Sequence, residues 1–213
     1  MKLLMKNKAR YFVPKRTFLI VILLLSAVGI MGFGLMGKKV PAKPNYVIKK
    51  DSVGSVMAFR QVYKVLESPR CMNCHPSGDV PLQGDDSHLH TMFPRRGVDG
   101  TGVYAMKCSN CHQATNTLGM HTPPGNPKWK LPPADMRMVF QGRTPHQLAK
   151  QLTDPKQNGN RGMEQLIAHA SDTLVKWAWH PGEGRTLPPL TYQQFKKAWI
   201  TWITKGAYAP AGK

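Results

Sequence analysis

The chain has 213 residues, a length that allows one ordinary domain with additional segments. It carries 30 Lys and Arg against 11 Asp and Glu, a formal net charge of +19, which bears on partners and solubility but not on fold. The sequence shows no paired carboxylates beside a base and no glycine-rich phosphate loop, which argues against catalysis by either arrangement.

The first 37 residues predict a membrane anchor. Residues 1–16 contain six basic side chains and no acidic one, and residues 17–37 contain no charge. As a helix, about 20 apolar residues span a hydrocarbon core of roughly 30 Å. The run is longer than the apolar part of a signal peptide, and no small-x-small cleavage site precedes Lys38, which favours an uncleaved anchor over a cleaved signal peptide. The basic flank places residues 1–16 in the cytoplasm and the rest in the periplasm of a bacterium.

The residues after the anchor predict an extended linker and then a helix. Residues 38–50 are basic and contain two prolines, so we expect them to be extended. Residues 51–68 predict an amphipathic helix that Asp51 or Ser52 can cap and that Pro69 ends. Its apolar positions, which recur at helical spacing, are Val56, Phe59, Val62, Tyr63 and Leu66.

All four cysteines lie in two copies of one pattern, Cys-x-x-Cys-His. The copies are Cys71, Cys74 and His75, and Cys108, Cys111 and His112. In this pattern each cysteine can form a thioether with a haem vinyl group, and the histidine is placed to bind the iron as proximal ligand. A zinc site, a thioredoxin-like redox site and two disulfides are the alternatives, but the pairs are too far apart for a compact zinc site and no βαβ context is visible. The pattern predicts two covalently bound haem c groups.

The segment 76–96 is rich in Gly, Pro, Asp and Ser, so we expect it to be irregular. It holds two free histidines just after a haem motif. We expect His90 to be a distal iron ligand, with His88 as a weaker candidate. Arg95 and Arg96 are candidates for pairing with haem propionates, because a planar guanidinium suits a carboxylate.

A second turn-rich segment, 114–133, follows the second motif. Met136 closes a proline-bounded loop at 129–136, a setting in which single-haem cytochromes c often place their distal methionine. Thioether ligation there would raise the potential of that haem. Met138 and His121 are weaker candidates for the same role.

The C-terminal third predicts three or four helices. Thr144, Pro145 and Gln147 form a capping-box pattern, and Thr191 with Gln194 forms another that opens a last helix closed by Gly206. Residues 163–170 predict a helix that carries His169 near its end, and a helix positions an iron ligand better than a loop tip. The remaining apolar residues of this part, among them Leu174, Val175, Trp177 and Trp179, should pack against the core or a haem.

These elements predict a fold that is mostly α with long irregular loops. We expect residues 1–16 to be a cytoplasmic N-terminus, 17–37 a transmembrane helix, 38–50 a linker and 51–213 a periplasmic dihaem cytochrome c domain. A haem with two axial ligands is an electron carrier, whereas one open iron position would give a haem enzyme of the peroxidase or sulfur-compound oxidase type. The supply of His and Met favours the carrier.

At its two motifs the chain resembles the dihaem c-type cytochromes. A looser resemblance covers about residues 60–208 and rests on the sequence PRCMNCHP, the segments 84–90 and 129–136, and the Trp-rich tail. It is to small dihaem proteins labelled isoquinoline 1-oxidoreductase subunits. That resemblance implies electron transfer from a periplasmic dehydrogenase to a respiratory chain.

The charge of the exported part predicts the kind of partner. Six of the 30 basic residues lie in 1–16, which leaves 24 against 11 acidic residues in 38–213, a formal +13. A positive surface favours a redox protein with an acidic docking surface or a position beside anionic lipid. We expect no nucleic-acid partner.

Overall fold

The computed structural model describes residues 46–212. The chain divides into two units, Met1–Pro44 and Asn45–Lys213, and the description that follows concerns the second. The expected anchor at 17–37 and most of the expected linker lie outside the described residues. No helix in the part of the chain that the structure describes is long and apolar enough to cross a bilayer.

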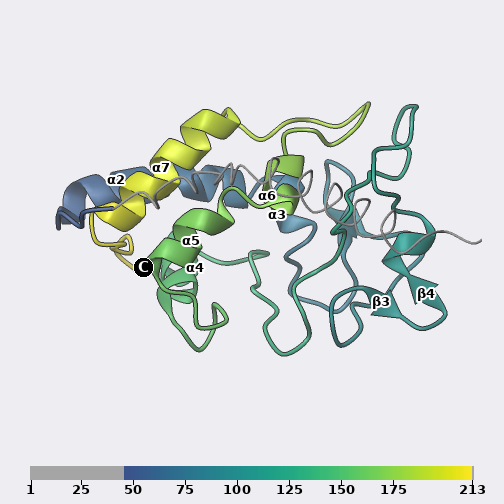
Figure 1. Ribbon diagram of the computed structural model, residues 1–213, viewed down its shortest axis with the longest axis horizontal. Coiled ribbons are helices and arrows are strands. Elements are labelled where there is room, and N and C mark those ends of the chain that lie inside the picture. The colour runs from purple at the N-terminus through teal and green to yellow at the C-terminus, as the bar shows by residue number, and fades with distance from the viewer. Residues whose placement is uncertain (1–45, 213) are drawn as a thin grey trace, which may run out of the picture. The chain divides into compact units, whose positions relative to one another are not determined.

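The regular structure of the described unit is mostly α-helix, joined by long irregular segments, as the sequence predicts (Figure 1). The helices are α2 (Ser52–Leu66), α3 (Pro69–Met72), α4 (Pro145–Thr153), α5 (Met163–His169), α6 (Thr173–Trp177) and α7 (Tyr192–Thr204). A short 3₁₀ turn, η1, spans Cys108–Asn110. Two antiparallel ladders pair β1 (Leu82–Gln83) with β2 (His88–Leu89) and β3 (Gly102–Val103) with β4 (Met106–Lys107).

Helices α2 and α7 lie side by side and form the framework of the unit (Figure 1). Asp51 caps α2 by accepting a hydrogen bond from the backbone N–H of Gly54 at 2.9 Å, as predicted. The same carboxylate pairs with Lys205 at the end of α7. Ser55 is fully buried between the helices, where its Oγ donates to the carbonyl of Trp202 and accepts from the N–H of Tyr208, both at 2.9 Å.

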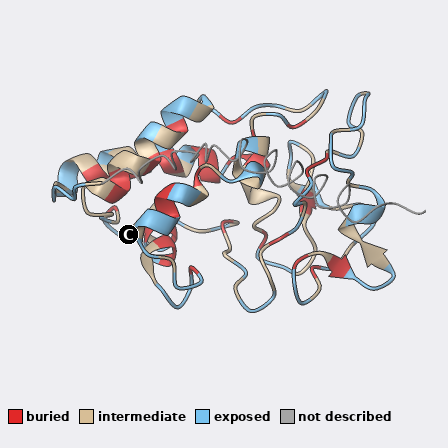
Figure 2. Cartoon of the chain, viewed as in Figure 1, coloured by how far each residue is buried: buried red, intermediate tan, exposed pale blue. Residues whose placement is uncertain are grey.

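The apolar core is made by the inner faces of α2, α4, α5 and α7 (Figure 2). Phe59 and Trp202 are fully buried and contact each other with ring centroids 4.7 Å apart. The predicted capping boxes at Thr144 and Thr191 are both present, and Gly206 follows α7 with a φ of 105°, a conformation that favours glycine. On α2, Phe59, Val62 and Leu66 are buried as predicted, whereas Val56 and Tyr63 are half-buried and Val65, which was not predicted, is fully buried.

Two local features differ from the sequence prediction. Pro69 does not simply end a helix, because it also occupies the first turn of α3, where its missing N–H costs nothing. The segment 76–96 contains the β1–β2 ladder within otherwise irregular chain. Helix α3 contains Cys71 of the first Cys-x-x-Cys-His motif, and the β1–β2 ladder follows that motif in the sequence.

Candidate functional site

The first motif lies on the short helix α3 and the turn after it. Cys71 is the third residue of α3, and Cys74 and His75 follow in a turn in which the N–H of His75 donates to the carbonyl of Met72 at 2.9 Å. Burial raises the pKa of the Cys71 thiol to about 12 and that of Cys74 to about 11. Both thiols are therefore neutral and unpaired in the structure.

The imidazole of His75 is oriented by two contacts. Its Nδ1 lies 2.7 Å from the carbonyl oxygen of Met138, and its ring stacks on Phe140 with centroids 3.9 Å apart and planes 8° from parallel. Burial lowers its pKa to about 4, so the ring is neutral at pH 7. Because a carbonyl only accepts, Nδ1 carries the proton and Nε2 has the free lone pair that a metal needs.

The second motif repeats this arrangement with different parts of the chain. Cys108 and Cys111 lie on and just after η1, and the Nδ1 of His112 lies 2.7 Å from the carbonyl oxygen of Pro124. The ring of His112 stacks on Trp129 with centroids 4.3 Å apart and planes 12° from parallel. Both motif histidines thus donate through Nδ1, stack on an aromatic ring and present Nε2.

A cavity of about 380 Å³ opens beside the first motif. Cys71, Cys74 and His75 line it from one side, and His169 and Met136, two of the predicted distal ligands, also line it. The Nδ1 of His169 lies 2.6 Å from a carboxylate oxygen of Asp172, which leaves Nε2 for a ligand. The sulfur of Met138 accepts a hydrogen bond from the amide of Gln151 at 3.1 Å, while its carbonyl holds His75.

His90, the other predicted distal ligand, lies beside the second motif. Its ring centroid is 6.3 Å from that of His112, and its Nδ1 is buried without a hydrogen-bond partner. A metal ion bound by one nitrogen of each of two histidines, at about 2.0–2.1 Å from each, would place the two ring centroids about 6 Å apart. The separation of His90 and His112 is close to this value. His88, by contrast, is exposed and pairs with Asp86. His121 is also exposed.

The two motifs are neighbours in space. Trp129, which stacks on His112 of the second motif, also lines the cavity that Cys71, Cys74 and His75 of the first motif line. Chain segments on both sides of the loop 76–107 therefore meet at one place.

The predicted propionate partners have different environments. Arg95 is exposed. Arg96 is fully buried, and its guanidinium donates to the carbonyls of Pro132 at 2.7 Å and Gly78 at 3.1 Å, while its Nε lies 3.7 Å from a carboxylate oxygen of Asp79. Neither Arg95 nor Arg96 lines the cavity beside the first motif. The cations that do line it were not predicted from the sequence, since nothing in their local pattern marks them: Arg70, Lys128, Lys130 and Arg161.

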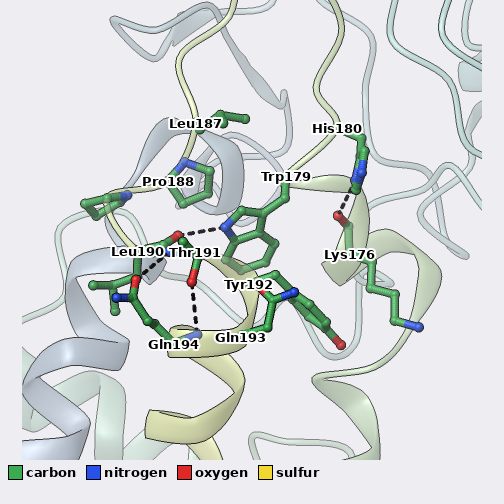
Figure 3. Close-up of a pocket in the computed structure, with 11 residues that line it drawn as sticks. Lys176, Trp179, His180, Leu187, Pro188, Leu190, Thr191, Tyr192, Gln193 and Gln194 are labelled. Carbon is green, nitrogen blue, oxygen red and sulfur yellow. Dashed lines mark hydrogen bonds between the residues drawn. The ribbon is translucent and has the colours of Figure 1, made fainter.

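A second depression, of about 490 Å³, lies at the surface between α6 and the start of α7 (Figure 3). Trp179 stands within it, and its indole Nε1 donates to the carbonyl of Leu190 at 2.7 Å. Trp179 also lines the cavity beside the first motif. Trp179 therefore lines both, and it packs against the apolar core, one of the two positions predicted for it.

No family model, curated protein or solved structure matches this chain.

Proposed function

We propose that this chain is a membrane-tethered dihaem c-type cytochrome that relays electrons between a periplasmic redox partner and a respiratory or photosynthetic chain. The observation that carries the proposal is the repeated geometry at the two motifs. In each, burial favours the neutral form of the histidine that follows the cysteine pair, and an Nδ1–H bond to a carbonyl leaves Nε2 as the nitrogen with the free lone pair. A bond of this kind fixes the tautomer and orientation of metal-binding histidines.

The residues of the first site fit a haem. The cavity of about 380 Å³ is in the range of small-molecule sites and is lined by both thiols and mainly apolar or aromatic side chains. Buried polar atoms without a hydrogen-bond partner are expected to be rare, yet the Nε of Arg70, which lines this cavity, has none. A haem propionate would supply an acceptor for this N–H.

The side chains that share a cavity or a contact with the motif histidines favour a carrier over an enzyme. His169 and Met136 line the cavity that His75 lines, and His90 lies beside His112. A bound haem supplies reversible one-electron exchange at its iron. His75 with His169 or Met136, and His112 with His90, would bind the iron of each haem and exclude substrate from it, and this is the arrangement an electron carrier requires.

The partner and location belong to the same proposal. Residues 17–37 would hold the domain at the bacterial inner membrane, with residues 1–16 in the cytoplasm and the haem domain in the periplasm. The positive charge of residues 38–213 would attract an acidic docking surface, for example that of a periplasmic dehydrogenase.

Optical spectroscopy of the protein made in a haem-attaching host tests the proposal. We expect low-spin haem spectra, two one-electron steps in a redox titration, and no rapid binding of carbon monoxide to the reduced protein. Rapid, stoichiometric carbon monoxide binding by one haem would instead support the haem enzyme.

A further inference from the structure

The residue before Cys71 is a buried cation. Arg70 has a side-chain exposure of 3% and lines the cavity with the two thiols of the first motif. Its Nη2 donates to the carbonyl of Gly84 at 3.1 Å and pairs with a carboxylate oxygen of Asp85. A guanidinium stays charged in proteins, so this charge must be balanced where it lies.

The second carboxylate oxygen of Asp85 extends the contact to another part of the chain. It accepts a hydrogen bond from the N–H of Thr186 at 3.0 Å. The neighbouring residue, Arg185, donates from Nη2 to the carbonyl of Thr122 at 2.7 Å and from Nη1 to the carbonyl of Pro181 at 3.3 Å. Asp85 thus connects α3 to the loop that holds Arg185.

The contacts end close to the second motif. Thr122 lies two residues before Pro124, whose carbonyl orients His112. A continuous series of side-chain and backbone contacts, which we name the Asp85 bridge, therefore runs from Arg70 through Asp85, Thr186 and Arg185 to Thr122. The Asp85 bridge links the surroundings of the two motifs. It contains two positively charged side chains, Arg70 and Arg185, and one negatively charged side chain, Asp85.

We infer that Asp85 is a positioning residue that sets the potentials of both haem sites, because its carboxylate balances Arg70 beside the first site and is joined through Arg185 to the second. The inference rests on the proposed function. Reduction places one more electron at an iron, so a nearby positive charge favours the reduced form and a nearby negative charge opposes it.

A redox titration of the complete haem-loaded chain with charge variants tests this. Asp85→Asn keeps the shape of the side chain and removes its charge. We expect it to raise the potential of the first haem by about 59 mV or more. At a fixed applied potential this is at least a tenfold increase in the ratio of reduced to oxidised haem, for transfer of one electron. The second potential should rise by a smaller amount. Arg70→Gln should lower the potential of the first haem. Asp85→Glu, which keeps the negative charge, should leave that potential near the value of the unaltered protein.

The opposite signs separate electrostatic balance from mere loosening of the fold, since loosening would move both variants in the same direction. Asp86→Asn is the matched control, because it changes the net charge by the same amount as Asp85→Asn. The Asp86 carboxylate is 73% exposed, and among the described residues its one ion pair is with His88. Its potentials should stay near those of the unaltered protein.

Three results would count against the inference. Equal potentials for Asp85→Asn and Asp86→Asn would overturn it and leave the proposed function standing. A shift of the same sign in Asp85→Asn and Arg70→Gln would also overturn it. An unaltered chain that carries no haem would overturn both proposals together.

Discussion

Four histidines form two pairs around the two motifs. His75 and His169 line one cavity, and His112 lies beside His90. Within each pair the members differ in origin, since one follows a cysteine pair and the other comes from a distant segment. The sequence marks the first kind by its motif, while the second kind is distinguished from other histidines only by where the fold places it.

Replacement of His169 by Ala tests its role as a distal ligand. Because His169 lines the same cavity as the first motif, we expect His169→Ala to convert about half of the haem from low spin to high spin, seen in the absorption spectrum. His88→Ala is the matched control, since His88 is exposed and paired with Asp86. A fully low-spin His169→Ala spectrum would remove His169 as a ligand and favour Met136.

Gly125 is required by a close approach of two backbone segments. A Cβ atom at this position would lie 1.9 Å from the carbonyl oxygen of Thr115 and 2.6 Å from that of Gln113. We expect Gly125→Ala to displace the neighbouring Pro124 carbonyl from His112 and to reduce haem attachment at the second motif, giving mostly chains with one haem by intact-mass analysis.

Gly78→Ala is the control for this experiment, because a Cβ there meets no atom within 4 Å. It should leave two haems on each chain. Equal haem content in the two variants would show that the turn before Gly125 does not position the second site.

At the scale of elements, the α2–α7 pair depends on one small buried residue. Ser55 is fully buried and bonds both to the carbonyl of Trp202 and to the N–H of Tyr208. Since buried groups without partners are costly, we expect Ser55→Ala to lower the free energy of unfolding by about 1–3 kcal/mol in denaturant titration. Ser52→Ala, an exposed position on the same helix, should change it far less. Similar losses in the two variants would contradict this account of the pair.

The helices could be predicted from the sequence because their signals are local. Thr144 and Thr191 each stand three residues before a glutamine, and both capping boxes form. The short helix α3 and the β1–β2 ladder could not be predicted in the same way, since a few residues give no periodicity. Their form is decided by contacts such as that of Arg70 with Asp85, which are 15 residues apart.

At the scale of the whole molecule, the site is built from segments that the sequence does not relate. The Cys-x-x-Cys-His motifs are visible at once, but the carbonyl that orients His75 comes from 63 residues away and the one that orients His112 from 12. A backbone carbonyl in an irregular loop has no signature in the sequence. The same holds for Arg70 and Arg185, whose importance follows only from their neighbours in the fold.

The central claim is that each motif carries a covalently attached haem. Intact-mass analysis of the protein, produced in a host that attaches c-type haem, tests this claim most directly. We expect the mass of the chain to exceed its sequence mass by that of two haem groups. When Cys108 and Cys111 are both replaced by Ser, the excess should fall to the mass of one haem group. A chain of unmodified mass from that host would contradict it.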